Sequence, residues 1–396
     1  MIASGKIISM ADKVRVGIVG LGGQGLAYAD LIADGLIPDM ALGAAFDVDI
    51  AKEQVAKSKY PGVPFYSDYG DLLDSGDVNA VIICVPHYLH PELGIAALKH
   101  DIHVLIEKPA GVYTKQVNEL NAVAAGKPEL TFAIMFNQRN NPLYREIKEI
   151  VSSGQIGEIR HTSWIITTWW RPQVYYDQSA WRGTWGGEGG GVLVNQAPHQ
   201  LDLWQWICGV PQSVFGKVAY GFRRNIAVED EVTALVDYGG GATGVLVTAT
   251  HDLVGTDRLE ILGDSGKIVV ENSRTARVTR LREPERQLGE GIDMPTVWRL
   301  LSGQQDTEAY YTSEVLEFEL TSDKGHAGVL ENFAANMLSD EPLIAPGAEG
   351  LNGVRLANAI YLSSWKGAEV SLDFDDEEYL SELNRRIADE GKFPTR

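Results

Sequence analysis

A glycine run near the start of the chain constrains the fold around it. Gly20, Gly22 and Gly25 have the spacing Gly-x-Gly-x-x-Gly and follow the apolar stretch Val14–Val19 directly. In a strand-to-helix turn that binds a dinucleotide, the first glycine permits the tight turn, the second lets the backbone approach a pyrophosphate, and the third lets the helix pack on its strand. Amides at the helix start would face the phosphates. Because the chain has 42 glycines, an ordinary glycine-rich turn is an equally good interpretation of this pattern alone.

An acidic residue at the end of a second strand favours the dinucleotide site. The apolar stretch 41–46 follows a helical pattern over residues 24–33 and ends at Asp47. A carboxylate there would accept hydrogen bonds from the adenosine ribose hydroxyls and would repel a 2′-phosphate. Because Val48 and Asp49 follow Asp47 where NADP would favour an arginine, the predicted cofactor is NAD; Lys52 keeps NADP open as the alternative.

Composition limits the classes of protein to which the chain can belong. Its 396 residues suffice for two domains, and 44% hydrophobic and 22% charged residues are ordinary for a globular protein. A formal net charge of −20 argues against nucleic acid and anionic membranes as partners. No apolar run is as long as a membrane span and Met1–Lys13 lacks a secretory signal, so a cytoplasmic protein is expected. Cys84 and Cys208 are expected as buried thiols, and no Cys/His cluster has zinc spacing, so no metal is predicted.

The order of apolar and helical patterns predicts an α/β protein. The first part alternates strands with helices, which is typical of a parallel sheet covered on both faces. A boundary near residues 137–142 gives an N-terminal Rossmann dinucleotide-binding domain over residues 1–137 and a C-terminal α/β domain over residues 138–396. The strands expected in the first domain are 14–19, 41–46, 80–85, 103–106 and 130–136, and the helices are 24–33, 91–99 and 114–124.

The second domain is predicted to contain a large open, mostly antiparallel sheet. Glycine-rich hairpin signals at residues 239–241 and 263–266 separate some of its β-rich runs. Residues 271–324 are polar and irregular and are expected to form a surface excursion, and helical patterns return at 327–338 and 350–364. The expected β-rich runs are 157–170, 214–221, 231–237, 243–250 and 258–270.

A lysine stands at the end of a strand expected in the first domain. Ligands of open α/β sheets collect at the carboxyl ends of the strands, and Glu107-Lys108-Pro109 follows the apolar run 103–106. Lys108 can donate there to a substrate hydroxyl or to the nicotinamide ribose, and its charge can stabilise a developing alkoxide. A lysine that reaches solvent is the commoner alternative. The cofactor-binding residues expected from the turn and the strand ends are Gly20, Leu21, Gly22, Gly23, Gln24, Gly25, Asp47, Pro86, His90, Glu107 and Lys108.

A glycine triplet precedes a second group of candidate residues. After residues 189–191, the spacing of Asn195, His199 and Asp202 predicts one face of a helix. A histidine near a helix start is favoured in its neutral form, which can act as a general base. Alternatives stay open, since a helical histidine is more often structural and Pro198 must break a helical hydrogen bond or mark the first turn.

Tryptophans concentrate around the same segment. Seven of the nine lie between Trp164 and Trp206, and aromatic faces suit the C–H surface of a sugar or cyclitol ring. Core or interface packing is the alternative, and it is expected for Trp204 and Trp206. The tryptophans beside the glycine-rich loop 186–191 are Trp169, Trp170, Trp181 and Trp185. The substrate-binding residues expected are Lys108, Trp181, Arg182, Asn195, Gln196 and His199.

Jointly, the glycine run, the Glu107-Lys108-Pro109 strand end and the glycine triplet with His199 resemble the Gfo/Idh/MocA oxidoreductases, the family of glucose-fructose oxidoreductase and inositol dehydrogenase. The resemblance covers nearly the whole chain, including the segment with Arg139. It implies a Rossmann domain followed by an α/β domain whose open sheet often mediates assembly, so a homo-oligomer, either a tetramer or a dimer, is expected.

The resemblance also implies site residues. The family commonly uses a lysine, an aspartate and a histidine at the reacting carbon, and Lys108 and His199 match two of them, whereas Asn195 replaces the aspartate. An amide cannot take up a proton as a carboxylate can, so His199 is expected as the principal base and Asn195 as a residue that orients a substrate hydroxyl. Asp202 matches a frequent family acid, and pairing within the second domain is an equally good interpretation of it.

The activity implied by the resemblance is that of an NAD-dependent dehydrogenase. It would oxidise a secondary ring hydroxyl of a sugar, anhydrosugar, glycoside or inositol to a ketone, at the position equivalent to C3. Inositol dehydrogenases and sugar 3-dehydrogenases such as levoglucosan dehydrogenase look nearest. Two alternatives remain: an NAD-dependent glycosidase that acts by transient C3 oxidation, and a non-catalytic NAD-bound sugar sensor.

Overall fold

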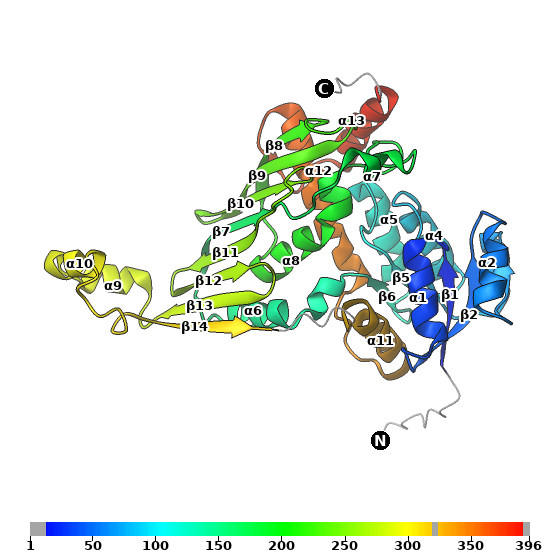
Figure 1. Ribbon diagram of the computed structural model, residues 1–396, viewed down its shortest axis with the longest axis horizontal. Helices are drawn as coiled ribbons and strands as arrows, with labels where there is room; N and C mark the ends of the chain where they lie inside the picture. Colours follow the sequence, from blue (N-terminus) through cyan, green and yellow to red (C-terminus); the bar gives the residue numbers. More distant parts are fainter. Residues whose placement is uncertain (1–12, 319–323, 391–396) are drawn as a thin grey trace. The chain divides into compact units, whose positions relative to one another are not determined.

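The structure, a computed structural model, describes residues 13–318 and 324–390 (Figure 1). These residues form two compact units. The first contains residues 13–111, 115–137 and 324–351, and the second contains residues 112–114, 138–318 and 352–390. In the described part of the chain, none of the helices has the length and apolarity needed to cross a membrane.

The first unit is built on a parallel sheet of six strands. Their spatial order is β3-β2-β1-β4-β5-β6, the order of a Rossmann fold, which reverses between β1 and β4. The predicted Rossmann fold is therefore confirmed, and the carboxyl ends of β1 and β4 form its switch point. The strands are β1 (Val14–Val19), β2 (Met40–Phe46), β3 (Phe65–Tyr66), β4 (Ala80–Ile83), β5 (His103–Ile106) and β6 (Phe132–Ile134).

Helices supply the rest of the first unit's core. The buried faces of β1 and β4 pack against apolar residues of α1 and α11, such as Tyr28, Ile32, Leu330 and Phe333. A segment more than 300 residues along the chain thus completes this core. The helices are α1 (Gly23–Ala33), α2 (Lys52–Lys59), α3 (Tyr69–Asp74), α4 (Leu89–Lys99), α5 (Thr114–Ala125), α11 (Lys324–Ser339) and the 3₁₀ turn η3 (Gly347–Glu349). The 3₁₀ turn η1 (Asn137–Asn140) begins at the last residue of the segment 115–137 of the first unit, and its other residues belong to the second unit.

The second unit contains a sheet of nine strands in the order β14-β13-β12-β11-β7-β10-β9-β8-β15. Only the β7–β10 pair is parallel, so the prediction of a mostly antiparallel sheet is confirmed. Both predicted hairpins are present, and Gly263 pairs with Gly266 across the second turn. The strands are β7 (Ile159–Ile166), β8 (Ser213–Tyr220), β9 (Glu229–Gly239), β10 (Ala242–Ala249), β11 (Asp257–Gly263), β12 (Gly266–Glu271), β13 (Thr275–Leu281), β14 (Tyr311–Glu317) and β15 (Val370–Ser371).

Helices pack against one face of this sheet. Trp204 of α8 is buried and donates its indole N–H to Thr162 Oγ1 of β7 at 3.0 Å, and α12 lies so close to β8 that a Cβ at Gly216 would stand 2.6 Å from the Ile360 carbonyl oxygen. The second unit also contains helices that do not pack on this face, such as α9 (Glu285–Gly291) and α10 (Met294–Leu301) (Figure 1). Its other helices are α6 (Pro142–Ser152), α7 (Gln173–Asp177), α8 (Pro198–Cys208), α12 (Gly350–Lys366), α13 (Asp376–Ala388) and the π turn η2 (Val192–Gln196).

The expected excursion over residues 271–324 is wrong in part. β13 and β14 extend the sheet at one edge, and only residues 282–310, with α9 and α10, leave it (Figure 1). Most side chains of β14 are exposed, so this edge strand lacks the alternation of apolar and polar residues that identifies a strand in a sequence.

Candidate active site

The glycine turn at the start of α1 has the geometry predicted for it. Gly20 has a φ of +97°, and a Cβ there would stand 2.6 Å from the Cys84 carbonyl oxygen; a Cβ at Gly25 would stand 1.9 Å from the Gly20 carbonyl oxygen. Both glycines are therefore needed for the fold. Gly22 is the N-cap of α1, its Cβ position meets no atom within 4 Å, and no side chain of the described residues caps the helix. The helix start is thus left open for a ligand's phosphates.

Asp47 joins the end of β2 to this turn. Its Oδ2 accepts the Leu21 backbone N–H at 2.8 Å and its Oδ1 accepts the Asp49 N–H at 2.9 Å. Each carboxylate oxygen retains acceptor capacity for a ribose hydroxyl. Together with the open helix start, this carboxylate fits NAD.

Gly22→Ala is expected to separate cofactor binding from folding. The new methyl group enters open space, so the melting temperature should stay within the range of the wild type, whereas NAD affinity should fall at least about ten-fold because the backbone can no longer approach the pyrophosphate. Titration with NAD and thermal unfolding measure the two effects. Gly353→Ala, which also meets no atom within 4 Å, is the matched control. Unchanged NAD affinity in Gly22→Ala would contradict the assignment.

Lys108 follows β5 beside a buried glutamate. Glu107 accepts the Tyr28 hydroxyl of α1 and, at 3.0 Å from Oε2, the Lys108 backbone N–H. Burial, with the nearby Glu107 charge, raises the pKa of Tyr28, so its hydroxyl stays a donor. The Lys108–Pro109 peptide is cis, and the Lys108 side chain is half-buried. Glu107 therefore fixes the main chain at Lys108, and Tyr28 is a site residue that the sequence analysis missed.

His90 connects the segments that follow β4 and β5. Its buried ring lies with Nδ1 2.7 Å from the Pro109 carbonyl oxygen and Nε2 2.8 Å from that of Val85, and burial lowers its pKa. Both ring nitrogens thus contact main chain of the protein, while Pro86 next to Val85 is exposed. The cofactor residues predicted from the sequence follow the carboxyl ends of β1, β2, β4 and β5, all in the first unit.

The predicted single helix across Asn195, His199 and Asp202 is wrong. Asn195 lies in the π turn η2, which the Ala197 N–H closes on the Val192 carbonyl at 2.8 Å, and α8 begins only at Pro198. Proline lacks the N–H that a continuous helix requires, and it fits the first helical position. His199 is therefore the second residue of α8, near a helix start as predicted.

Asp202 is part of a buried ion pair within the second unit. Its Oδ1 and Oδ2 accept Arg139 Nη2 at 2.6 Å and Arg139 Nε at 2.9 Å, and both side chains are almost fully buried. The Arg139 guanidinium also lies 5.4 Å from the Trp206 ring centroid. The structure thus supports the pairing interpretation of Asp202.

The glycine triplet before Asn195 is required by close packing. A Cβ at Gly189, Gly190 or Gly191 would stand 2.2 Å from Val112 Cγ1, 2.3 Å from Tyr361 Oη or 2.0 Å from the Glu229 carbonyl oxygen. The fully buried Glu229 carboxylate accepts the Gly191 N–H at 2.7 Å, the Leu193 N–H at 2.9 Å and the Tyr361 hydroxyl at 2.7 Å. It holds the start of η2, and no signal in the sequence pointed to it.

Burial raises the pKa of Glu229 to about 7, which makes stability depend on pH. Because the pKa of Glu229 in the folded state lies above its ordinary value, the contribution of Glu229 to the free energy of unfolding is present at low pH. This contribution is lost as pH rises through the folded-state pKa. Between pH 4 and 8, the free energy of unfolding of the wild type relative to Glu229→Gln should fall by about 3 kcal/mol. Denaturant unfolding of both proteins at several pH values measures it, with the exposed Glu146→Gln of α6 as control. Parallel pH curves for wild type and Glu229→Gln would contradict the role.

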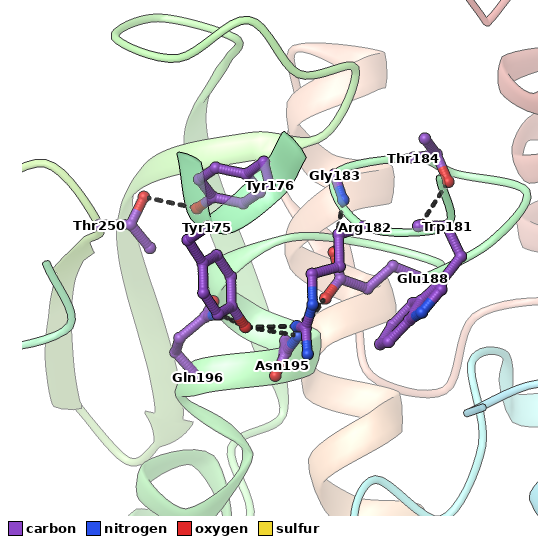
Figure 2. Close-up of polar contacts among 10 residues, drawn as sticks. All are labelled: Tyr175, Tyr176, Trp181, Arg182, Gly183, Thr184, Glu188, Asn195, Gln196 and Thr250. Carbon is purple, nitrogen blue, oxygen red and sulfur yellow. Dashed lines mark hydrogen bonds and ion pairs between the residues drawn. The ribbon is translucent and has the colours of Figure 1, made fainter. Parts of the chain in front are cut away.

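Several predicted substrate residues of the second unit meet around a buried glutamate (Figure 2). Glu188 is 1% exposed; it accepts the Asn195 side-chain N–H and, at 2.7 Å, the Gly183 backbone N–H, and it lies 3.8 Å from Arg182 Nη1. The Tyr175 hydroxyl oxygen accepts Arg182 Nη1, Asn195 Nδ2 at 3.5 Å and Gln196 Nε2 at 3.4 Å.

The aromatic residues of this region divide between the site and the core. The Arg182 guanidinium lies 4.5 Å from the Tyr175 ring centroid and 4.6 Å from that of Trp181, so Trp181 belongs to the cluster. Trp185 does not: it is fully buried, its indole N–H donates to the Ala227 carbonyl at 3.0 Å, and it packs against Tyr361. The sugar-stacking interpretation of Trp185 is therefore wrong, and Glu188 and Tyr175 are residues that the sequence analysis missed.

Cysteines and metal ligands play no part in this arrangement. Burial raises the pKa of both thiols, Cys84 and Cys208, which are not paired with each other. Within residues 13–318 and 324–390, no group of three or more His, Cys, Asp or Glu side chains could hold a metal ion.

The candidate catalytic and substrate residues are divided between the two units. Lys108 lies in the first unit, and Asn195, Gln196 and His199 lie in the second.

Comparison with known proteins finds a family model for most of the N-terminal part of the chain and another for much of the second unit. Residues 14–134 match the family model "Oxidoreductase family, NAD-binding Rossmann fold", and residues 144–269 match "GFO/IDH/MocA C-terminal domain". The myo-inositol 2-dehydrogenase of Thermotoga maritima is 26% identical over 368 residues, or 91% of this chain and 99% of the relative. The levoglucosan dehydrogenase of Pseudarthrobacter phenanthrenivorans is 26% identical over 296 residues, or 66% of this chain and 75% of the relative.

A solved structure extends the similarity to the fold of almost the whole chain. The WlbA dehydrogenase from Bordetella pertussis, in complex with NADH and UDP-GlcNAcA, superimposes with a TM-score of 0.73 at 25% identity. The alignment covers 92% of this chain and 100% of that chain.

Proposed function

This chain belongs to the Gfo/Idh/MocA family of NAD-binding oxidoreductases, and from that premise we propose that it oxidises a secondary ring hydroxyl of a sugar, anhydrosugar, glycoside or inositol to a ketone. The hydroxyl is the one equivalent to C3. The observation that carries the proposal is the cluster of hydrogen-bonding side chains that Arg182, Asn195 and Gln196 form in the segment before His199.

Each proposed reacting group has a distinct task. The neutral imidazole of His199 removes the hydroxyl proton, and the Lys108 ammonium donates a hydrogen bond to the same oxygen and stabilises its negative charge. NAD, held by the open start of α1 and by Asp47, supplies the acceptor for the hydride that leaves the carbon. Asn195 orients the substrate and transfers no proton, because an amide does not titrate in this range.

The relatives support a cyclic, polyhydroxylated substrate. One is a dehydrogenase of myo-inositol, another acts on levoglucosan, and the WlbA dehydrogenase binds UDP-GlcNAcA. Arg182, Gln196 and Tyr175 offer several donors and acceptors on one side of η2, which suits a ring with more than one hydroxyl group.

We also propose a homo-oligomer, a tetramer or a dimer. The large sheet exposes one large apolar side chain on each of five strands, namely Ile165, Phe215, Leu235, Leu262 and Val315, each 36% exposed or more. Phe215 and Leu235 are paired across β8 and β9, and exposed apolar side chains gathered on a sheet are a frequent sign of subunit contact. Light scattering on the purified protein tests the assembly, and a monomer at micromolar concentration would refute it.

A substrate panel tests the function. NADH formation, read by its absorbance, should be seen with at least one of myo-inositol, levoglucosan, glucose, xylose, an aryl glucoside and UDP-GlcNAcA. Release of the aryl group without accumulation of NADH would instead indicate a glycosidase. Saturable ligand binding without NAD reduction across the panel would indicate a sugar sensor.

A further inference from the structure

Glu188 is anchored so that one of its oxygens has a fixed partner. Its carboxylate is 1% exposed, and Oε2 accepts the Gly183 backbone N–H at 2.7 Å. A main-chain N–H cannot rotate or exchange its donor for an acceptor. The geometry at Gly183 is tight as well, because a Cβ there would stand 2.6 Å from Ile226 Cγ2. The other oxygen, Oε1, is thereby directed at the side chain of Asn195.

The charge of this carboxylate is balanced locally. Arg182 Nη1 lies 3.8 Å from Oε1 and donates to the Tyr175 hydroxyl. Arg182 thus faces Glu188 directly, and the charge of Glu188 also acts on Tyr176, whereas Tyr175 contacts Arg182 and Asn195. A carboxylate beside a guanidinium is a strong hydrogen-bond acceptor for the N–H groups that contact it.

These contacts determine which way the Asn195 amide is turned. An ionised carboxylate accepts hydrogen bonds only, so the NH₂ group of Asn195 must face Glu188. The same nitrogen, Asn195 Nδ2, also lies 3.5 Å from the Tyr175 hydroxyl oxygen, so the second hydrogen of the NH₂ group points toward Tyr175. The carbonyl oxygen Oδ1 is therefore turned away from both Glu188 and Tyr175.

We propose that Glu188 is a positioning residue of the active site: it holds the Asn195 amide with Oδ1 directed at the substrate, so that this oxygen accepts a hydrogen bond from a substrate hydroxyl. The inference rests on the proposed function and adds a chemical requirement to it. The ring position that faces Asn195 must carry a donor. A methoxy or fluoro group there presents only acceptors to Oδ1 and is bound poorly.

The substitution Glu188→Gln should reverse the orientation of the Asn195 amide, although glutamine has nearly the same shape as glutamate. The Gly183 N–H forces the introduced glutamine to place its oxygen where Oε2 stood, so its new NH₂ group faces Asn195. Asn195 must then turn its own oxygen to that glutamine and its NH₂ group to the substrate. The Kd of myo-inositol and of levoglucosan with NADH bound, and the KM of whichever compound is oxidised, should rise about 10- to 100-fold, while the Kd of NADH stays unchanged.

A second substitution should restore the wild-type pattern. In the double variant Glu188→Gln, Asn195→Asp, one oxygen of the introduced aspartate accepts from the introduced glutamine and the other faces the substrate as an acceptor, and the net charge of the cluster equals that of the wild type. The KM and the ligand Kd should return to within about three-fold of the wild type. If Glu188 had a purely structural role, no such rescue would be expected, because the double variant still lacks a carboxylate at position 188.

Stability gives a readout that needs no turnover. Asn195→Asp alone places two carboxylates in contact, so its melting temperature should fall from pH 5 to pH 8 relative to the wild type, and this fall should disappear in the double variant. Equal pH dependence of Asn195→Asp and the double variant would overturn the proposed contact. If no compound of the panel is oxidised, the proposed function fails, whereas this comparison still decides the orientation of Asn195.

Glu229→Gln is the matched control for the loss of a buried glutamate. Glu229 accepts hydrogen bonds from two backbone N–H groups at the start of η2. Its carboxylate therefore binds the main chain, whereas the carboxylate of Glu188 binds the side chain of Asn195. Asn195→Asp should not rescue the ligand affinity of Glu229→Gln. Rescue in both backgrounds would show that an aspartate at position 195 acts independently of position 188 and would refute the proposal.

Discussion

Replacing His199 by alanine is expected to lower kcat by about 10²- to 10⁴-fold, the usual loss when a general base is removed. The imidazole at the first turn of α8 is the group proposed to take the hydroxyl proton, and no other residue of the second unit is assigned this task. NAD binds in the first unit, so the Kd of NAD should stay within about two-fold of the wild type. Steady-state kinetics and NAD titration measure the two quantities.

His251→Ala is the control for this prediction. His251 is a partly exposed histidine of the same unit, paired with Glu231 at 2.9 Å, and has no proposed role in catalysis. Its replacement should leave kcat unchanged. A kcat of the His199→Ala enzyme close to that of the wild type would exclude His199 as the base.

Replacing Lys108 by alanine is expected to lower kcat/KM by about 10²- to 10³-fold, because a positioned charge that stabilises a developing oxyanion is lost. Lys108→Arg should retain more activity than Lys108→Ala, since the charge persists, and less than the wild type, since a guanidinium does not reproduce a compact ammonium. Initial rates with the oxidised substrate measure the series.

Lys127→Ala provides the comparison for loss of a lysine in the first unit. Lys127 is partly buried and pairs with Asp101 away from the strand ends described above. The Lys127→Ala variant should have the same kcat/KM as the wild type. Equal activity of Lys108→Ala and Lys127→Ala would remove Lys108 from the mechanism.

The cofactor half of the site could be predicted from the sequence because its signals are local. The strand, the glycine run and Asp47 lie within a short segment, and each glycine acts on atoms of the same turn or of the adjacent strand, as the contacts of Gly20 and Gly25 demonstrate. The contribution of α11 to the core depends on packing across the chain, which no local pattern encodes.

The substrate half was predicted less completely, for physical reasons that differ between residues. Spacing alone placed Asn195 and His199 on one helix, and the missing N–H of Pro198 divides that segment into two elements. Glu229 acts on a turn 38 residues before it, so only the folded sheet brings it there. Glu188 lies in a glycine-rich loop without periodicity, where a carboxylate is ordinarily interpreted as solvent-exposed.

The assignment of residues 324–351 to the first unit bears on how this protein could be re-engineered. Leu330 and Phe333 of α11 fill the same core as the apolar side of β1, yet the chain between residues 138 and 318 builds the other unit. A chimera that takes its coenzyme module from a relative must therefore graft α11 together with the N-terminal segment. A splice at residue 137 alone would join a nucleotide fold to a foreign helix and leave its hydrophobic interior mismatched.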